Sequence, residues 1–394
     1  MTPPGTPTRP LTPAQALRYA RQLSLPGLGS EGQQRLLDSS VALVGVGGLG
    51  SPLAAYLAAA GVGRLVLVDG DRVDPSNLHR QVLFGASDVG RLKVEAARER
   101  ILALNPDARV EVHAVRLDAS NARDILGGVG CVADGSDNFP TRYLVNDACV
   151  LMGIPNAHGS IFRYEGQVSF FDPKRGGPCY RCLHPEPPPP GLVPSCAEAG
   201  VLGVLPGVVG GLQATEVVKH LLGAGDLLVG RLLVYDALAL RFRELRLRRD
   251  PACAACGDKP TIRELKMIEG YGEVCASPSA APASAEEETP AVLGPEELRD
   301  RLAGPTPPVL LDVRDDWEVA IGALPGAVHI PMTDLPGRWR ELPRDREVVV
   351  YCHAGVRSAR AAHWLRTQGL RRVASLDGGT DAWSAVVDPT LPRY

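Results

Sequence analysis

The sequence lacks the features that mark a membrane protein or a secreted protein. It contains no run of about eighteen apolar residues, the length that a bilayer-spanning helix needs. The opening segment, Met1–Pro10, is rich in Pro and Thr and has no apolar core of the kind found in a secretion signal. The nine cysteines are an odd number scattered over the chain, which argues against a secreted disulfide framework. We therefore expect a cytoplasmic protein without a membrane partner.

A strong charge of either sign is also missing. The net charge is −3 at pH 7, which gives no bulk attraction to nucleic acid. We therefore expect no nucleic-acid partner. The apolar fraction of 45% and the charged fraction of 22% are typical of a soluble globular protein.

The length of 394 residues exceeds one ordinary compact core, and one domain per about 150 residues suggests two or three domains. Ala, Ser, Pro and three consecutive Glu residues crowd together over 276–290, a composition typical of a solvated linker. We predict a first domain over 1–270, a linker over 271–290 and a smaller α/β domain over 291–394. The two domains share no repeated motif.

The first domain follows an alternating α/β pattern. Val41–Val44 is a short apolar run suited to a buried parallel strand, and it leads into Gly45–Gly50 and an Ala/Leu-rich helix. Leu65–Val68 is a second such strand and ends at Asp69. This strand–turn–helix–strand unit is the context that a Gly-rich nucleotide fingerprint requires. We also expect a helical stretch over 11–40 and strands near 110–115, 129–133, 166–171 and 231–247.

The glycine loop predicts a nucleotide site. Gly45–Gly50 lets the backbone approach a phosphate closely, and the helix that follows offers unpaired N–H groups and a positive dipole end. Asp69 is placed to accept hydrogen bonds from ribose hydroxyls. This pattern alone fits NAD, FAD, S-adenosylmethionine or ATP, and it also fits a tight turn that binds nothing.

Residues further along the chain favour ATP. A triphosphate needs several cationic donors and an acidic metal ligand, whereas an NAD enzyme needs no cluster of cations. Arg21, Arg80 and Lys93 could supply the donors, and Asp137 could supply the metal ligand.

These motifs, taken in order, resemble the MoeB/ThiF family of molybdopterin-synthase and thiamine-pathway adenylyltransferases, which are relatives of ubiquitin-activating enzymes. The resemblance covers about residues 15–260 and rests on Arg18-Tyr-Ala-Arg21-Gln22, Gly45–Gly50, Asp69-Gly-Asp71, Ser76-Asn77-Leu78-His79-Arg80-Gln81, Lys93 and Ser136-Asp137-Asn138. It implies ATP contacts from Gly48, Asp69, Ser76, Asn77, Leu78, His79, Arg80, Lys93, Asp137 and Asn138. It further implies that Asp137 holds Mg²⁺ and that Arg21 reaches into the neighbouring subunit of a homodimer, with Arg21, Arg80 and Asp137 as catalytic residues.

Two Cys-x-x-Cys pairs predict a structural zinc site. Cys179 and Cys182 form one pair, and Cys253 and Cys256 form the other. Two such pairs complete a tetrahedral shell of four sulfurs, which leaves no open coordination position for catalysis. Some seventy residues separate the pairs, so they must meet through the fold. The alternative is two unrelated buried or redox-active pairs.

A further cysteine, Cys196, follows the stiff Pro-rich stretch Glu186–Pro190. In the family that the chain resembles, a cysteine here lies on a mobile crossover loop and in some members bonds covalently to the activated carrier. Cys196 is therefore a candidate catalytic residue, and the alternative is an inert thiol.

The C-terminal domain carries the loop Cys352-His-Ala-Gly-Val-Arg357 after an apolar strand at Val348–Val350, with a helix expected just after Arg357. A thiol at a helix N-terminus and near an arginine has a lowered pKa, and a persulfide anion there is stabilised. A similar Cys-x₅-Arg loop serves tyrosine phosphatases, so the loop alone is ambiguous. The flanking motifs Leu311–Arg314, Leu324–Pro331 and Leu376–Gly379 resemble the rhodanese (sulfurtransferase) family. The alternative is a catalytically dead module, which typically lacks the cysteine.

The two resemblances together imply an α/β protein: a Rossmann-like adenylation domain of the MoeB/ThiF type with a zinc knuckle, followed by a small rhodanese domain. They imply ATP, Mg²⁺ and Zn²⁺ as cofactors and adenylation of the Gly-Gly end of a small ubiquitin-like sulfur carrier of the MoaD/ThiS type. The Cys352 persulfide, loaded by a cysteine desulfurase or by thiosulfate, would then give a thiocarboxylate. A non-catalytic scaffold for sulfur-relay partners and an NAD-linked dithiol oxidoreductase are the alternatives, and the pathway served stays open.

Overall fold

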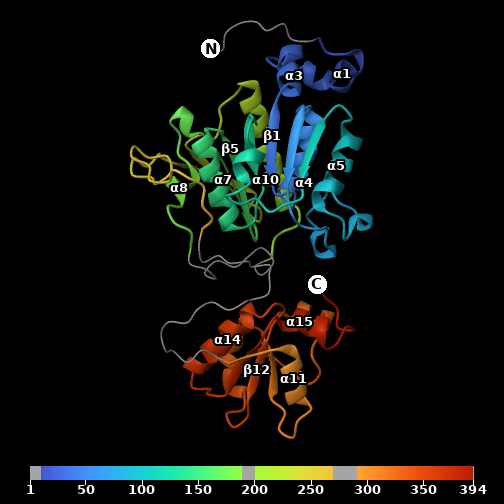
Figure 1. The fold of residues 1–394 in the computed structure, drawn as a ribbon, viewed down its shortest axis with the longest axis vertical. Coiled ribbons are helices and arrows are strands. Elements are labelled where there is room, and N and C mark those ends of the chain that lie inside the picture. Colours follow the sequence, from blue (N-terminus) through green and yellow to red (C-terminus); the bar gives the residue numbers. More distant parts are fainter. Residues whose placement is uncertain (1–9, 189–199, 269–290, 394) are drawn as a thin grey trace. The chain divides into compact units, whose positions relative to one another are not determined.

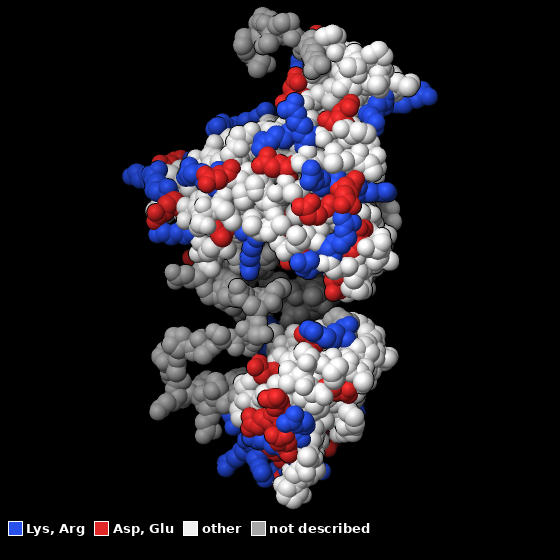
Figure 2. Space-filling model, turned by 45° about the vertical axis from the view of Figure 1, so that its right-hand side comes forward, with Lys and Arg blue, Asp and Glu red and all other residues white. Residues whose placement is uncertain are grey.

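The computed structural model describes residues 10–188, 200–268 and 291–393, and its chain divides into two compact units, Met1–Gly272 and Glu273–Tyr394 (Figure 1). The linker predicted over 271–290 lies outside the described residues. No helix among the described residues is both long and apolar enough to cross a bilayer. Basic and acidic side chains are interspersed on the face of the molecule drawn in Figure 2.

The first unit is built on an eight-stranded sheet of order β3-β2-β1-β4-β5-β6-β7-β8. The strands from β3 to β5 pair in parallel, and those from β5 to β8 pair antiparallel. The predicted strands therefore form, and those beyond β5 extend the sheet as antiparallel neighbours. The bounds are β1 Ser40–Val44, β2 Arg64–Val68, β3 Arg109–His113, β4 Cys131–Asp134, β5 Asn156–Phe162, β6 Glu165–Phe171, β7 Arg231–Asp236 and β8 Arg241–Arg246.

Helices cover both faces of this sheet, because the central strands carry apolar side chains on both of their faces. Val41 and Leu43 of β1 pack with the helices α4, α5 and α10, whereas Ala42 and Val44 pack with α6 and α7. The structure is therefore doubly wound. The helices of this unit are α1 Pro13–Arg18, α2 Ala20–Leu23, α3 Gly29–Leu37, α4 Gly50–Ala60, α5 Lys93–Leu104, α6 Ala122–Leu126, α7 Phe139–Met152, α8 Tyr180–Leu183 and α10 Leu205–Leu222, with the 3₁₀ turns η1 Pro75–Asn77, η2 Ala86–Asp88 and η3 Pro173–Arg175.

The helical stretch predicted over 11–40 is divided into α1, α2 and α3. The helix stops after Leu23 because Pro26 and Gly27 follow, and Gly27 has a φ of +82°, which does not continue a right-handed helix.

The second unit is a smaller α/β layer with a parallel five-stranded sheet of order β11-β10-β12-β13-β9. The sequence predicted that its helix α14 would begin just after Arg357. The helix begins at Val356 instead, so Arg357 lies inside its first turn. Gly355, with a φ of +86°, ends the loop, and the helix begins two residues earlier than expected. The elements are β9 Ala291–Leu293, α11 Pro295–Leu302, β10 Val309–Asp312, α12 Asp316–Ile321, β11 Val328–His329, α13 Leu335–Arg338, η4 Trp339–Glu341, β12 Val348–Tyr351, α14 Val356–Thr367, β13 Val373–Leu376 and α15 Gly379–Val386.

Candidate functional sites

The glycine loop lies where the carboxyl ends of β1, β2 and β4 meet. Because these three strands are parallel neighbours, the loops that follow them leave the sheet at one edge. Gly45 N–H donates to the Val68 carbonyl and Gly135 N–H to the Val44 carbonyl, both at 2.9 Å. A Cβ on Gly45 would lie 2.9 Å from the Gly135 carbonyl oxygen, so only glycine fits this crossing.

The carboxylate of Asp69 holds the glycine loop through a hydrogen bond to its backbone. Its Oδ2 accepts from Val46 N–H and its Oδ1 from Asp71 N–H, each at 2.9 Å. Burial raises the pKa of Asp69, and the nearby Lys93 ammonium opposes that rise. The sequence pointed to Asp69 only as an acceptor for ribose. The structure adds that its carboxylate holds the loop in place.

Lys93 is the first residue of α5 and is paired with Asp71, to which the sequence assigned no role of its own. Its Nζ lies 2.7 Å from Asp71 Oδ2, and its backbone N–H donates to the Asp71 carbonyl at 3.0 Å. The Lys93 side chain is 7% exposed, whereas that of Asp71 is 74% exposed. The Asp-x-Asp spacing after β2 was the signal in the sequence that could have identified Asp71.

The predicted stretch from Ser76 to Arg80 forms η1 and the turn after it. Asp74 begins this turn by accepting from Ser76 N–H at 2.8 Å and from Ser76 Oγ at 2.6 Å. The Ser76 carbonyl in turn accepts from Arg80 Nη1 at 3.0 Å and lies 2.9 Å from His79 Nδ1. Asn77 Nδ2 lies 3.3 Å from Ser76 Oγ.

Two contacts connect this turn to the glycine loop and the core. A Cβ on Gly48 would lie 3.8 Å from Arg80 Cδ, so the structure brings Arg80 and Gly48 together. Leu78 packs against the core of the first unit and anchors the turn between its polar neighbours.

Asp137 and Asn138 follow β4 at the same edge of the sheet. Asn138 caps α7 by accepting from Thr141 N–H at 3.0 Å. Asp137 is exposed, and its Oδ1 lies 3.4 Å from Asn138 Nδ2. An exposed carboxylate without an ion pair among the described contacts suits a hard cation such as Mg²⁺.

Arg21 lies apart from the other predicted nucleotide residues of its own chain. It is exposed on α2, and its neighbour Gln22 donates to the Ala60 carbonyl at the C-terminal end of α4. The glycine loop precedes the other end of α4, whose 11 residues span about 16 Å. The structure therefore does not bring Arg21 to the nucleotide loop of the same protomer.

The four predicted zinc ligands meet. All four sulfur atoms lie within 4.8 Å of one another, with Cys179 and Cys253 3.6 Å apart and Cys182 and Cys256 3.4 Å apart. Tetrahedral Zn–S bonds of about 2.3 Å would separate the sulfurs by about 3.8 Å, so the arrangement fits zinc.

Polar contacts hold the cysteine cluster to α7. The Arg181 guanidinium forms two hydrogen bonds with the Asp147 carboxylate, at 2.7 and 2.8 Å, and it lies over the Tyr143 ring. Arg249 donates twice to the Cys256 carbonyl, at 2.7 and 3.0 Å, and so fixes the second pair. These supports around the ligands are the usual surroundings of a structural metal site.

Cys352 directly follows β12, and the loop that it begins leads into the N-terminus of α14 at Val356. Its side chain is buried, with the residue 1% exposed, and its Sγ accepts from Gly355 N–H at 3.1 Å. Ser358 Oγ lies 3.6 Å from the same sulfur. An amide donor and the positive end of a 12-residue helix both favour negative charge on this sulfur or on one bonded to it.

Arg357 has a partner that the sequence did not reveal. Both of its terminal nitrogens lie 2.6 Å from the carboxylate oxygens of Glu318, which is buried in α12. This hydrogen-bonded carboxylate raises the pKa of Arg357 and fixes the guanidinium beside the cysteine loop. The glutamate lies 39 residues before the arginine, so loop spacing alone could not find it.

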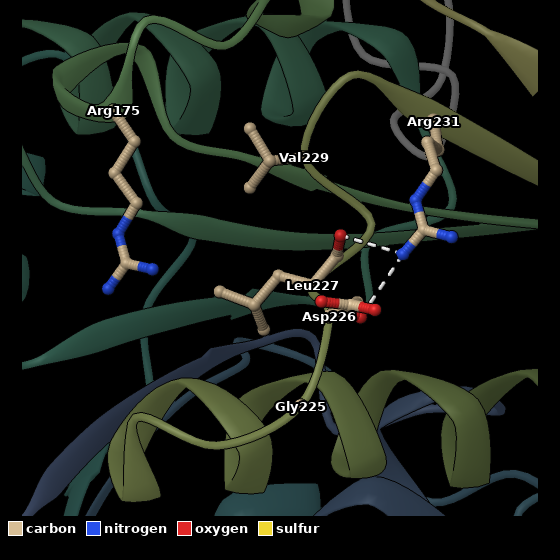
Figure 3. Close-up of a pocket in the computed structure, with 6 residues that line it drawn as sticks. All are labelled: Arg175, Gly225, Asp226, Leu227, Val229 and Arg231. Carbon is tan, nitrogen blue, oxygen red and sulfur yellow. Dashed lines mark hydrogen bonds between the residues drawn. The ribbon is translucent and has the colours of Figure 1, made fainter.

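A surface hollow of about 460 Å³ lies elsewhere in the first unit (Figure 3). Arg231 donates across it to the carbonyls of Asp226 and Leu227, at 3.1 and 2.9 Å, and Arg175 pairs with Asp172. None of the predicted site residues lines this hollow. The predicted catalytic residue Cys196 lies outside the described residues.

Two family models match the chain, one for each unit. The ThiF family matches residues 19–255, and the rhodanese-like domain matches residues 294–386.

Curated relatives match two thirds of the chain or nearly all of it. A Mycobacterium tuberculosis protein named "Probable adenylyltransferase/sulfurtransferase MoeZ" is 45% identical over 393 residues, covering 98% of this chain and 97% of the relative. The Sus scrofa "Adenylyltransferase and sulfurtransferase MOCS3" is 44% identical over 420 residues, covering 99% and 90%. The "Sulfur carrier protein adenylyltransferase" of Thermus thermophilus is 57% identical over 258 residues, covering 64% of this chain and 95% of the relative.

Among solved structures, a crystal structure of E. coli MccB has the fold of the first unit. Its TM-score is 0.55 at 22% identity, and the match covers 61% of this chain and 74% of that one.

Proposed function

The chain belongs to the adenylyltransferase/sulfurtransferase family that joins a ThiF domain to a rhodanese-like domain, and from this premise we propose that it converts a carrier carboxylate to a thiocarboxylate. The substrate we propose is the Gly-Gly carboxylate of a small ubiquitin-like sulfur carrier of the MoaD/ThiS type. One observation carries the proposal: the same chain holds a Cys352 sulfur that accepts an amide hydrogen at a helix N-terminus and a glycine loop with a buried lysine beside it.

In the first step, a carboxylate oxygen of the carrier attacks the α-phosphorus of ATP. The bond between that phosphorus and the β-phosphate oxygen breaks, and pyrophosphate leaves a carrier acyl-adenylate. Lys93 and Arg80 stabilise the charge that develops on the phosphates, because fixed cations at a partly buried site need little reorganisation. Asp69 accepts from the ribose hydroxyls, while Gly48 leaves room for the phosphate chain. Ser76, Asn77, Leu78, His79 and Asn138 complete the surroundings of the nucleotide.

The residues present also fit Mg²⁺. Asp137 would hold it at the edge of the sheet, where its carboxylate is exposed. When bound, Mg²⁺ supplies charge neutralisation on the phosphate oxygens.

We further propose that the active form is a homodimer. Arg21 lies at the far end of α4 from the glycine loop of its own protomer. It therefore serves the site of the second protomer, where its charge helps to stabilise pyrophosphate as it leaves.

Sulfur enters at Cys352. Its thiolate attacks the outer sulfur of thiosulfate, with sulfite leaving, or the persulfide of a cysteine desulfurase, whose thiolate leaves. The outer sulfur of the Cys352 persulfide then attacks the acyl carbon, the bond to AMP oxygen breaks, and an acyl disulfide forms. One thiol attacks the Cys352 sulfur and releases the thiocarboxylate; a second thiol resolves the new disulfide. Cys196 or an external thiol supplies the first.

The four cysteines hold Zn²⁺ as a structural ion with no open position. Thiol chemistry of this kind needs a reducing compartment, which fits a cytoplasmic location. The carrier serves molybdopterin, thiamine or thiolated tRNA synthesis.

The direct test is to mix the protein with each candidate carrier, ATP, Mg²⁺, thiosulfate and a thiol reductant, and to measure the intact mass of the carrier. The carrier that is the substrate should gain the mass of one sulfur-for-oxygen exchange. ATP–pyrophosphate exchange without this mass change for any carrier would contradict the sulfur-transfer step.

A non-catalytic scaffold for sulfur-relay partners is the second candidate. It predicts wild-type sulfur transfer in cells that carry Cys352→Ala. Loss of transfer in those cells would exclude it.

A further inference from the structure

We propose that Tyr180, the residue after the first zinc-ligand cysteine, is a positioning residue for the adenylation site. Through His158 and Asp134 it sets the backbone of the loop Gly135–Asn138, which carries Asp137. This inference rests on the adenylation function proposed above for that loop.

The cysteine cluster fixes the place of the Tyr180 ring. Cys179 and Cys182 flank the residue, and its backbone N–H donates to Asn146 Oδ1 of α7 at 2.7 Å. The ring is buried, 3% exposed, and its centroid lies 5.0 Å from that of His158 and 5.1 Å from that of Tyr143. A metal bound to the four sulfurs would thus also hold the Tyr180 ring beside His158.

His158 transmits this position to Asp134. It lies on β5, packed between Tyr180 and Phe171, whose ring centroid is 5.6 Å away. Its Nδ1 faces Asp134 Oδ2 at 3.5 Å, and neither atom has a hydrogen bond among the described residues. The ring is therefore held against the carboxylate by packing, to which Tyr180 contributes one side and Phe171 the other.

Burial shifts the pKa of both members of this pair, and neighbouring groups act on Asp134 against that shift. Burial lowers the pKa of His158. Burial alone would raise the pKa of Asp134, but the His158 ring and the Arg142 guanidinium bring it below its ordinary value.

Asp134 in turn shapes the loop. Its Oδ1 accepts from Ser136 N–H at 3.0 Å and from Ser136 Oγ at 2.6 Å. The Ser136 carbonyl accepts from Arg142 at 3.1 and 3.3 Å. Asp137 is the next residue and is itself exposed, so the backbone at Ser136 decides where its carboxylate lies.

Burial of an aromatic ring is common, and Tyr180 could serve the core alone. The two roles differ in what its removal does. Loss of packing lowers the stability of the whole unit, whereas loss of positioning changes the loop and the rate while the cysteine cluster stays filled.

The test uses the full chain with Tyr180→Leu, which keeps an apolar side chain and removes the ring. We expect full zinc content, a kcat for ATP–pyrophosphate exchange lowered about tenfold, and a smaller change in the KM for ATP. Backbone hydrogen exchange over Gly135–Asn138 should become faster, because the Ser136 N–H bond to Asp134 loosens. This second readout does not depend on catalysis.

Tyr235→Leu is the matched control. Tyr235 is also buried and stacks on Phe242 at 4.6 Å, but it lies on β7, three strands from β4 and thus about 14 Å away. It should lower the melting temperature without changing loop exchange or kcat. An equal change in both variants would show that Tyr180 acts only through stability.

His158→Phe keeps the proposal testable if Tyr180→Leu loses zinc. Phe retains the ring packing, removes the nitrogen that faces Asp134, and lies away from the metal ligands. We expect faster loop exchange and a lowered kcat at full zinc content. Wild-type kcat and wild-type loop exchange in this variant would overturn the proposal. If the wild-type chain shows no ATP–pyrophosphate exchange with any carrier, the adenylation function fails, and the hydrogen-exchange comparison still decides whether Tyr180 and His158 position the loop.

Discussion

The candidate nucleotide site in the first unit and the cysteine loop in the second unit differ in where their residues come from. The nucleotide residues lie after three strands, β1, β2 and β4, and contacts such as that of Asp69 with Val46 N–H join the loops. The cysteine loop is one continuous segment from Cys352 to Arg357, which runs from the end of β12 into the first turn of α14. In the dispersed site several groups share the stabilisation of charge, whereas in the continuous loop the reaction depends on one sulfur atom.

Cys352→Ser should have the largest effect. Sulfur transfer should fall by more than about a thousandfold, because the nucleophile itself is lost. ATP–pyrophosphate exchange should stay within about twofold of the wild type, since the first unit is unchanged. Both rates are measured on the same preparation. A parallel fall in exchange would show that the two sites are not separate.

Cys253→Ser tests whether the cysteine cluster is structural. Zinc content should fall, and the first unit should lose several kcal/mol of stability on the order expected for removal of a structural metal. Thermal unfolding and metal analysis measure this, and Cys131→Ser provides a control at a buried cysteine outside the cluster. Full zinc content in Cys253→Ser would rule the site out.

Lys93→Ala tests the dispersed site. Removal of one cation among several should lower the kcat for ATP–pyrophosphate exchange about a hundredfold and leave sulfur loading of Cys352 unchanged. Arg98→Ala, also on α5, is the control on the same helix. A complete loss of exchange would mean that the first site also depends on one group.

Glu318→Gln tests whether the reactivity of the cysteine loop depends on a residue outside the loop. The amide keeps one hydrogen bond to Arg357 and loses the charge pairing, so we expect a loss of about 2 kcal/mol in the second unit and about a tenfold slower loading of Cys352. Denaturant unfolding and thiosulfate kinetics report these changes. Loading of Cys352 at the wild-type rate would show that sulfur transfer does not depend on Glu318.

The same contrast explains how far the sequence could go. The loop Cys352–Arg357 could be predicted from the sequence because the group that donates to the Cys352 sulfur, the Gly355 N–H, belongs to the same loop. Only the start of α14 was misplaced, by the left-handed turn at Gly355. The glycine loop and the Cys-x-x-Cys pairs were also visible, since their spacing is set by local geometry.

Contacts between distant segments were not visible. Glu318 meets Arg357 across 39 residues, and Asp71 holds Lys93 across 22. No spacing rule joins Tyr180 to His158, because the contact depends on how β5 and the cysteine cluster pack. The sequence thus supplied the groups that we propose carry the chemistry, while the residues that hold them in place required the fold.

The central claim is that ATP activation in the first unit and sulfur from Cys352 act on one carrier in succession. The measurement that tests it most directly is intact mass spectrometry of the carrier and of the protein after a single turnover with ATP, Mg²⁺ and thiosulfate, without reductant. The account predicts a covalent adduct between the carrier and Cys352, absent in Cys352→Ser and released as thiocarboxylate on addition of a thiol. A carrier that becomes thiocarboxylated at the wild-type rate in Cys352→Ser would contradict it.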